Sequence, residues 1–490
     1  MTTTLAPTPA APRPASALEQ AKPAHARWSR ANREFLEFVE RNPACLRRAS
    51  YAPLYEDPSL VSFSVQPWPL FFDAARLREL SEMSVGLDRL MKGVTERLLA
   101  DPVRAAAFYH TRGSMDGAPT LAREFSEDMI EILADEPNGI QAAHSRADYI
   151  ETADGLKFLE FNAGGFIGGL HTDHLCAQYL RCEPTARFLR ETGRRAAPMG
   201  VCRALFRHVV DDTVRLGAWT EGDFNVAMVV RPHTPEILAQ HSEGTYTRDL
   251  CAALRQGGAG EVGRVILCSL DELTVGRDGV TVHGEPVHAV IEQHNGQGDI
   301  RAVFRAFKMG YVNLFSGPIG DLLSDKRNLA LLSEHAGSNE FTAAERSLID
   351  RHVPWTRRVQ PGHTTFRGRP LRLPEDLPAQ RENLVLKKAS SIGGDFVVVG
   401  RYRTPDEWDR TIARALWEQD WVVQEYLETL PYCFQNEHAG ASAHELVWGL
   451  FVFGEHFGGV HLRMQTTGRA GGVVNTRQGA DIGAGLALLG

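Results

Sequence analysis

The sequence predicts an α/β protein of two or three domains. Apolar residues spaced three or four apart indicate helices through residues 28–139, whereas alternating polar and apolar residues indicate β-hairpins at 145–162 and 384–401. A series of strand, helix and strand begins near Asp223. Because 490 residues exceed what one compact core supports and 43% of them are hydrophobic, several cores are expected.

Composition argues against some classes of partner. The chain has 53 basic and 61 acidic residues, a net charge of −8, and neither sign forms a long run. This balance argues against nucleic acid or an anionic membrane as the main partner. No apolar run approaches the roughly 20 residues of a membrane span. The seven cysteines form no CxxC pair and fit free thiols in a reducing compartment, so we expect a cytoplasmic protein.

The amino-terminal region reads as a leader followed by helices. Residues 1–27 repeat Ala and Pro without a basic start or an apolar core, which is typical of a disordered leader rather than a signal peptide. Residues 28–139 carry helical apolar stripes, for example at Leu80, Met83 and Leu87. We expect an α-rich region there, and its composition indicates no chemistry.

Residues 145–162 predict a hairpin that gathers polar side chains. Asp154-Gly155 supplies the turn, and side chains in a strand repeat every two residues, so Glu160 and Asn162 leave the same face. One bulged residue at the turn sets Asp148 opposite Glu160, because the residue numbers of paired positions in a hairpin add up to a constant.

Two carboxylates and a carboxamide then converge on one patch. Unpaired like charges repel, so the patch favours a cation, and oxygen ligands of this kind suit Mg²⁺. The alternative is a solvated hairpin face, the commoner fate of alternating polar residues. The glycine-rich loop that follows, 163–170, is either a substrate or phosphate loop or a tight structural turn. We expect His171 and His174 to be ordinary polar groups.

A second unit begins near Asp223. Strands are expected at 224–230, 264–268 and 287–292, with a helix at 247–255 and a hairpin at 275–282. This order suggests a small α/β unit with a parallel sheet. No GxGxxG follows the first strand, which disfavours a dinucleotide site.

Two further segments lead to the second hairpin. An amphipathic helix carrying Lys326 is expected at 322–335. Residues 361–378 are rich in Pro and Arg and are expected to loop across the surface.

The hairpin at 384–401 carries lysines and a loop of small residues. Its first strand ends in Lys387-Lys388, and the loop contains Ser391, Gly393 and Gly394. Unhindered backbone N–H groups and a strand lysine can together hold phosphate oxygens. This is not a P-loop, because no GKS/T sequence opens a helix. An ordinary hairpin explains the segment equally well.

The remaining chain predicts one helix and three strands. Thr404, Pro405 and Glu407 mark the start of a helix with a capping box. The strand at 421–427 runs out into polar residues. Strands at 447–453 and 458–464 are expected to pair, and the second carries Arg463 near its end.

These segments, in this order, resemble the circularly permuted ATP-grasp ligases, the glutathionylspermidine synthetase-like family. The match is strongest at Arg146-Ala147-Asp148 and at Glu160-Phe161-Asn162, where Glu160 follows Asp148 by 160 − 148 = 12 residues. In that family the Asp, Glu and Asn bind the Mg²⁺ of Mg-ATP. The usual ATP-grasp order has the Glu and Asn last, and here they come first, as permutation implies.

The resemblance implies a role for each matching residue. Asp148, Glu160 and Asn162 would bind Mg²⁺, and Arg146 would face the reacting acid. Lys326 would lie near the nucleotide, and Arg463 would contact its phosphates. The loop over the phosphates would comprise Lys387, Ser391, Gly393 and Gly394. The adenine base would bind the backbone of Gln424, Glu425, Tyr426 and Leu427.

Two departures from the family pattern stand out. The family has Lys-Pro where this chain has Lys387-Lys388, which leaves the choice of phosphate lysine open. Ala163-Gly164-Gly165 replaces the usual Asp or Ser residues after the Asn, which indicates a different substrate pocket.

The implied fold is α/β: a circularly permuted ATP-grasp with antiparallel sheets, a small Rossmann-like α/β unit and an α-rich amino-terminal region. The expected parts are a disordered leader at 1–27, the α-rich region at 28–139, a metal-binding part at 140–215, the small α/β unit at 216–320 and a nucleotide-binding part at 321–490.

The implied activity is that of an ATP-dependent carboxylate–amine ligase that forms an acyl phosphate and then an amide. ATP and Mg²⁺ would be its cofactors. Its partners would be a small-molecule or short-peptide carboxylate and an amine, with amino acids or small peptides as the family-level expectation and specialised metabolism as one setting. Two alternatives stay open: a phosphotransferase acting on a small molecule, and a non-catalytic Mg-ATP-binding protein. The sequence indicates neither the substrates nor the oligomeric state.

Overall fold

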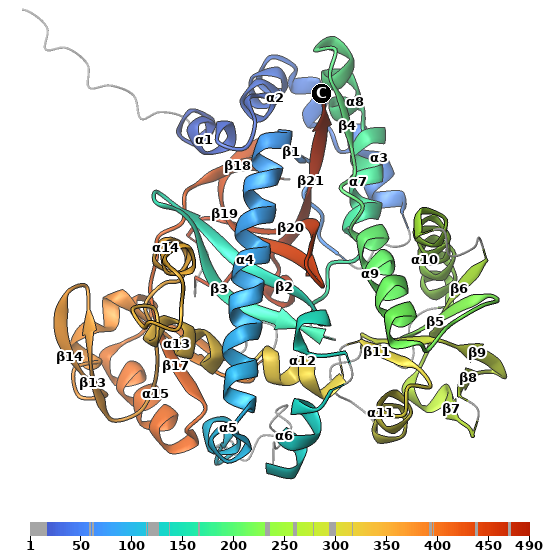
Figure 1. The fold of residues 1–490 in the computed structure, drawn as a ribbon. Helices are drawn as coiled ribbons and strands as arrows, with labels where there is room; N and C mark the ends of the chain where they lie inside the picture. The colour runs from blue at the N-terminus through green and yellow to red at the C-terminus, as the bar shows by residue number, and fades with distance from the viewer. Residues whose placement is uncertain are drawn as a thin grey trace, which may run out of the picture.

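The computed structural model is a mixed α/β protein with several sheets (Figure 1). It describes residues 17–490 apart from 58–59, 61–62, 114, 116–126, 137, 165–166, 231–235, 258–261, 278, 294–299, 316, 392–393, 395, 437–439 and 469–471. The predicted leader residues 1–16 therefore lie outside the described residues.

The largest sheet that the described residues form has eight strands and joins distant parts of the chain. Its central path runs β1-β21-β20-β19-β2-β3, with β18 beside β19 and β4 beside β21. Its strands are β1 (Leu70–Phe72), β2 (His144–Thr152), β3 (Gly155–Ala163), β4 (Arg195–Ala197), β18 (Tyr432–Asn436), β19 (Gly440–Phe453), β20 (His456–Thr466) and β21 (Asp481–Leu489). The predicted pairing of 447–453 with 458–464 is confirmed by β19 and β20, whereas β21 was not predicted.

The hairpin β2–β3 confirms the predicted pairing of Asp148 with Glu160. The predicted position of the bulge is wrong. Thr152 pairs with Gly155 across a two-residue turn, and the register changes between Asp148 and Tyr149, so Leu159 is the extra residue of β3. Gly155 supports the tight turn because its φ is +98°, a conformation that side chains with a Cβ disfavour.

A second, four-stranded antiparallel sheet has the order β12-β17-β15-β16. It contains β12 (Thr356–Arg358), β15 (Leu384–Lys388), β16 (Val397–Val399) and β17 (Trp421–Glu425). Helix α15 (Pro405–Glu418) begins with the predicted capping box between Thr404 and Glu407 and covers this sheet. The prediction of a surface loop at 361–378 is wrong, because β13 (Gly362–Phe366) and β14 (Arg369–Leu373) form a hairpin there that buries Phe366 and Leu371.

The third sheet is parallel, with the order β11-β10-β5-β6. Its strands are β5 (Phe224–Val229), β6 (Gly263–Cys268), β10 (Ala289–Glu292) and β11 (Asn313–Phe315). Successive residues alternate between two cores: Val226 and Met228 pack with helices α9 (Val201–Leu216) and α10 (Glu236–Gly257), whereas Ala227 and Val229 pack with α11 (Arg301–Lys308). A strand buried on both faces explains why its sequence is a continuous apolar run. A small meander, β7 (Leu273–Val275), β8 (Val280–Val282) and β9 (Glu285–Val287), lies beside this sheet.

The amino-terminal helices share one core with the largest sheet. The long helix α4 (Ala74–Leu99) crosses a face of that sheet (Figure 1), and Leu87, Met91 and Val94 are buried against it. Helix α1 (Ala17–Ala26) lies within the segment predicted as a disordered leader. It packs beside α2 (Arg30–Arg41) and β18, because Ala21 and Ala24 are small enough to be buried there.

The single helix predicted at 322–335 is two helices. α12 (Gly317–Leu323) ends before Asp325, and α13 (Lys326–Glu334) begins after it. The Asp325 carboxylate caps α13 by accepting a hydrogen bond from the Arg327 N–H, so the break has a local cause. Lys326 therefore stands in the first turn of α13.

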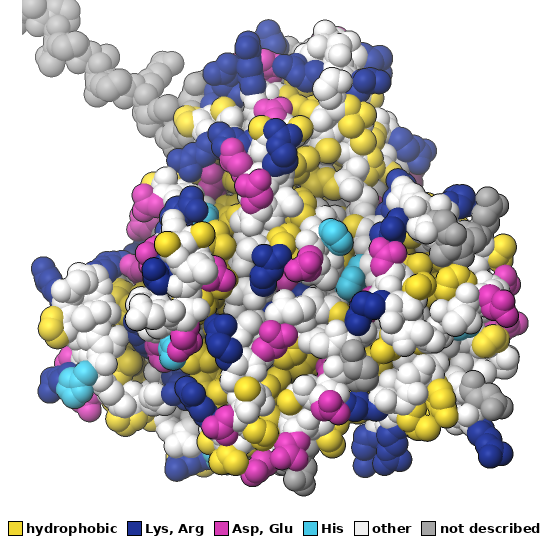
Figure 2. All heavy atoms as spheres, viewed as in Figure 1, with side chains coloured by type: hydrophobic (Ala, Val, Ile, Leu, Met, Phe, Trp, Pro, Cys, Tyr) yellow, Lys and Arg dark blue, Asp and Glu magenta, His cyan; other side chains and the backbone are white. Residues whose placement is uncertain are grey.

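Other helices complete the shell around the sheets. They are α3 (Ala52–Glu56), α5 (Pro102–Tyr109), α6 (Glu127–Ala134), α7 (Thr172–Arg181), α8 (Glu183–Glu191) and α14 (Ala343–His352). Among the described residues, no helix combines the length and the apolar character that crossing a membrane requires. Basic and acidic side chains are both spread over the face shown in Figure 2.

Candidate active site

A cavity lies between the eight-stranded sheet and the four-stranded antiparallel sheet. The first sheet contributes Asp148, Glu160 and Arg463, and the second contributes Lys387 and Gln424. Other lining residues are Gly394 between β15 and β16 and Glu425 at the end of β17. The segment after β17 and a late loop add Tyr426, Leu427, Thr429, Gly472, Val473, Val474 and Asn475. The cavity therefore collects residues from four separate parts of the sequence.

Asp148 is the most heavily hydrogen-bonded group in this cavity. Arg146, two residues earlier on β2, donates from Nε to Oδ1 at 2.9 Å and from Nη2 to Oδ2 at 3.2 Å. Arg463 on β20 donates from Nη2 to Oδ2, and the Asn162 amide donates to the same oxygen at 3.0 Å. Burial raises the pKa of Asp148, but the charges of Arg146 and Arg463 outweigh it and hold the pKa at about 2. Asp148 is therefore an anion shared by two arginines.

Glu160 and Lys326 face each other at the edge of the cavity. The Lys326 Nζ lies 3.6 Å from the Glu160 Oε2 and donates to the Ser391 carbonyl at 3.1 Å. The Glu160 side chain is 26% exposed, whereas Asp148 is 1% exposed. Glu160 is thus the carboxylate of this pair with oxygens open to a ligand.

Lys387 is positioned by two acceptors. Its Nζ donates to the Gln424 Oε1 at 2.6 Å and to the Leu159 carbonyl at 3.2 Å. Leu159 is the bulged residue of β3, and a bulge leaves the extra residue out of the ladder, so its carbonyl can point to a side chain. Burial lowers the pKa of Lys387 to about 8, partly opposed by the nearby Glu160 charge.

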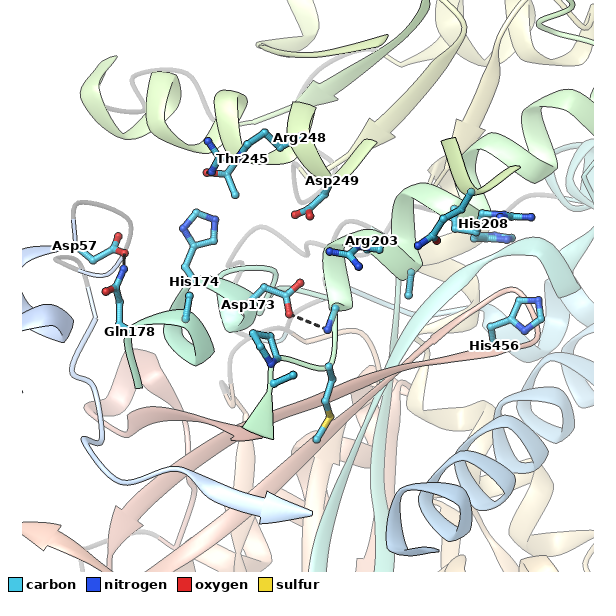
Figure 3. Close-up of a pocket in the computed structure, with 18 residues that line it drawn as sticks. Asp57, Asp173, His174, Gln178, Arg203, His208, Thr245, Arg248, Asp249 and His456 are labelled. Atoms are coloured by element: carbon cyan, nitrogen blue, oxygen red, sulfur yellow. Dashed lines mark hydrogen bonds between the residues drawn. The ribbon is translucent and has the colours of Figure 1, made fainter. Parts of the chain in front are cut away.

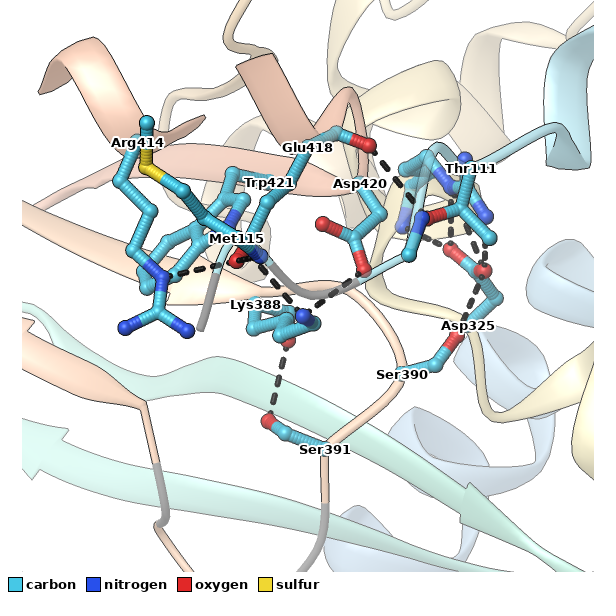
Figure 4. Close-up of polar contacts among 12 residues, drawn as sticks. Thr111, Met115, Asp325, Lys388, Ser390, Ser391, Arg414, Glu418, Asp420 and Trp421 are labelled. Carbon is cyan, nitrogen blue, oxygen red and sulfur yellow. Dashed lines mark hydrogen bonds and ion pairs between the residues drawn. The ribbon is translucent and has the colours of Figure 1, made fainter. Parts of the chain in front are cut away.

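Lys388 points away from the cavity, because successive side chains of a strand alternate. Its Nζ contacts the Glu418 Oε2 at 3.0 Å and the Asp420 Oδ2 at 3.5 Å (Figure 4). Glu418 also accepts hydrogen bonds from the Arg414 side chain and the Met115 N–H. Of the two candidate lysines, Lys387 is thus the one that lines the cavity, and Lys388 holds the strand to the elements behind it.

The loop after Lys388 is tied to helix α13. Ser390 donates through Oγ to the Asp325 Oδ2 at 3.2 Å, and Ser391 donates to the Lys388 carbonyl at 3.0 Å (Figure 4). Gly394 lines the cavity with φ of +77°, and a Cβ there would meet Val473 at 2.9 Å. Gly393 lies outside the described residues.

The segment 424–427 forms one wall of the cavity. The Glu425 N–H donates to the Trp355 carbonyl at 2.9 Å, and the Tyr426 N–H donates to the Asn383 carbonyl at 2.7 Å. Among the described residues, the Leu427 N–H has no backbone acceptor. Within this segment, Leu427 therefore has a backbone donor left for a ligand.

The predicted residues divide into those that line the cavity and those that support it. Arg146, Asn162 and Lys326 do not line the cavity but touch residues that do. Ser391 lies one contact further away, because its carbonyl accepts from Lys326 and its hydroxyl donates to the Lys388 carbonyl. The third guanidinium nitrogen of Arg146, Nη1, donates a hydrogen bond to the Ile167 carbonyl. Gly449 on β19 pairs with Asp148 on β2 and makes room for the Arg146 side chain. A Cβ at position 449 would lie 2.7 Å from the Arg146 Cδ.

Sequence reasoning missed Glu445, which lines the cavity from β19. Burial raises the pKa of Glu445. The predicted strand began at Val447 because the apolar run begins there, whereas β19 begins at Gly440. Extending the two-residue alternation backward from Val447 would have placed Glu445 on the same face.

The residues present fit an anion and a hard cation. The Arg463 Nε is buried and has no hydrogen-bond partner among the described residues, which suits a phosphate oxygen as its acceptor. Lys326, Lys387 and Arg463 supply positive charge, whereas Glu160 and the Asn162 amide oxygen supply oxygen ligands of the type that Mg²⁺ accepts.

Comparison with known proteins adds little to this geometry. No family model matches the chain, and no curated protein sequence matches it. A crystal structure of a protein proposed to be a gamma-glutamylcysteine synthetase, from Methylobacillus flagellatus KT, aligns with 83% of this chain and 88% of its own at 10% sequence identity and a TM-score of 0.37. A similarity of that extent assigns neither a family nor an activity. The fold and the site define a mixed α/β protein with a charged cavity between the eight-stranded sheet and the four-stranded antiparallel sheet.

Proposed function

We propose that the protein is an ATP-dependent carboxylate–amine ligase that works through an acyl phosphate. The observation that carries this proposal is the meeting of oxygen ligands and cations at one cavity. Asp148, Glu160 and Asn162 come from one hairpin, and Lys326, Lys387 and Arg463 surround them from three other segments.

We propose further that the eight-stranded sheet and the four-stranded antiparallel sheet form a circularly permuted ATP-grasp, with the parallel unit as its small Rossmann-like part. Two facts support this. The hairpin with the oxygen ligands precedes the lysine-bearing strand β15 in the sequence, and β2 nevertheless pairs directly with the late strand β19.

The nucleotide would lie with its base against 424–427. The Leu427 N–H is the available donor for the base edge, and Lys387, Lys326 and the Arg463 Nε would contact phosphate oxygens. Glu160 and the Asn162 amide oxygen would hold Mg²⁺, with Asp148 as the third ligand if it exchanges one arginine. Bound Mg²⁺ would neutralise phosphate charge during transfer.

The proposed chemistry has two steps. A carboxylate oxygen attacks the γ-phosphorus and ADP leaves, and then an amine nitrogen attacks the acyl carbon, loses a proton and expels inorganic phosphate. Arg146 would orient the acid by exchanging its Ile167 contact for the carboxylate, and it would stabilise the oxyanion of the second step. Amino acids or small peptides are the substrates we propose to test first.

Hydroxylamine provides the test. The protein, Mg-ATP and hydroxylamine are incubated with a panel of amino acids and short peptides as acids, and hydroxamate and ADP are measured. We expect equal amounts of both with the true acid, and neither with Glu160→Gln. Hydroxamate forms only from an activated acyl group.

Two outcomes would favour the alternatives. ADP release with a phosphorylated product and no hydroxamate would indicate a phosphotransferase. Calorimetric binding of Mg-ATP without ADP release on any acid and amine pair would indicate a non-catalytic nucleotide-binding protein.

A further inference from the structure

A second cavity opens where helices α7, α9 and α10 meet the segment 197–200 (Figure 3). Its volume is about 740 Å³, within the range of small-molecule pockets. It shares no lining residue with the cavity that holds Lys387 and Arg463. It is therefore a separate site by position.

Two opposite charges extend into this cavity, and no hydrogen bond or ion pair within the described residues holds either of them. Asp249 comes from α10 and Arg203 from α9, and Figure 3 shows both between the helices. The other two arginines differ: Arg207 is paired with Asp211 at 2.7 Å, and Arg248 donates to Thr245 at 2.9 Å.

The acidic side of the cavity does not suit a metal ion. Asp173, Cys202 and Asp249 place ligand atoms within 4.8 Å of one another. However, Asp173 already accepts from the N–H groups of Gly200, Val201 and Cys202 and so caps helix α9. The buried Cys202 thiol donates to the Leu170 carbonyl at 3.3 Å, so it is already used within the fold.

An organic cation suits the acidic side better. Burial and the neighbouring Asp173 raise the pKa of Asp249 more than the charges of Arg203 and Arg248 lower it. An ammonium group beside Asp249 would offset both the burial and the repulsion from Asp173. An anionic group of the same ligand would then meet Arg203 across the cavity. The remaining wall includes Ala177, Pro198, Met199 and Ala204, which offer an apolar surface.

We propose that this cavity binds a free α-amino acid with an aliphatic side chain. Its carboxylate pairs with Arg203, its ammonium group pairs with Asp249, and its side chain lies against Pro198 and Met199. The proposal concerns a site outside the nucleotide cavity and does not depend on the ligase activity.

Calorimetry with three matched ligands tests the proposal. L-leucine carries both charges, L-leucinamide lacks the carboxylate and 4-methylpentanoate lacks the ammonium group. We expect the wild-type protein to bind leucine at least tenfold more tightly than either analogue. Arg203→Gln should bind leucine and leucinamide alike, and Asp249→Asn should bind leucine and 4-methylpentanoate alike, each at least tenfold weaker than wild type binds leucine.

The controls separate this site from the nucleotide cavity and from misfolding. Arg207→Gln removes a lining arginine that already has a partner, and it should bind leucine like the wild type. Glu160→Gln should also bind leucine normally, because it changes only the first cavity. Equal melting temperatures would show that the variants fold. Failure of the wild type to bind leucine at millimolar concentration, or unchanged binding in both Arg203→Gln and Asp249→Asn, would overturn the proposal.

Discussion

Arg463 and Asp148 form a buried ion pair although 315 residues separate them in the sequence. Asp148 stands on β2 and Arg463 on β20, with β19 between these strands in the sheet. The pair joins the early hairpin to the carboxy-terminal part of the chain. It also makes Asp148 structurally different from Glu160, its partner in the hairpin.

Asp148→Asn should therefore lower stability, whereas Glu160→Gln should not. The first change leaves Arg146 and Arg463 buried with one fewer counter-charge, which costs about 3 kcal/mol in comparable buried pairs. The second weakens a 3.6 Å contact with Lys326 at a part-exposed side chain, and the Gln amide can still hydrogen-bond with Asp148. Urea denaturation measures both, and equal stabilities would contradict the distinction. We expect Glu160→Gln to lose substrate-dependent ADP release while it stays folded.

Gly449→Ala should disturb the acid site without affecting the nucleotide site. The new Cβ would lie 2.7 Å from the Arg146 Cδ, so the arginine must shift. We expect KM for the acid to rise at least tenfold while Mg-ATP affinity changes less than threefold, on the order of effects from misplacing a positioning group. Gly337→Ala is the matched control, because its Cβ would meet nothing within 4 Å. An unchanged KM for the acid would argue against a role for Arg146.

Binding of a non-hydrolysable ATP analogue should weaken as pH rises above about 8. Burial lowers the pKa of Lys387 to about 8, so its charge is present at pH 7 and is mostly lost at pH 9.5. If only the charged form binds phosphate, affinity falls about tenfold for each unit above that pKa. Lys387→Arg should bind equally at both pH values, and Lys387→Gln should bind weakly at both. A pH response that persists in Lys387→Gln would assign it to another group.

Asp420→Asn should stabilise the protein more at pH 7.5 than at pH 4.5. Burial raises the pKa of Asp420 from 3.8 to about 6, so the folded state holds a proton that the unfolded state releases between these values. The stability from this group is complete below pH 3.8 and is lost as pH rises through 6. Asn imitates the protonated acid at every pH, so the gap between variant and wild type should grow by about 2 kcal/mol.

Chemical denaturation at both pH values measures that gap. Comparing variant with wild type at each pH removes contributions of opposite sign from other carboxylates, such as Asp148. A gap that stays constant between the two pH values would contradict a raised pKa at Asp420.

Local patterns predicted the pairing within the first hairpin and the start of α15, because both depend on neighbouring residues alone. Alternation and a turn were enough to pair Asp148 with Glu160, and Thr404 with Glu407 was enough to start α15. Prediction failed where a single residue interrupts a regular strand or helix. The bulge at Leu159 was placed at the turn, and the Asp325 cap that divides α12 from α13 was read as helix.

The sequence determines which side chains of a strand share a face, because side-chain direction repeats every two residues. That period separates Lys387 from Lys388, but it does not say which face meets the other sheet. Packing of the four-stranded sheet against the eight-stranded sheet decides that Lys387 lines the cavity and that Lys388 meets Glu418. The same packing brings Arg463 to Asp148, a contact that no local sequence pattern predicts. The energy of this ion pair depends on burial and on charges that come from strands hundreds of residues apart in the sequence.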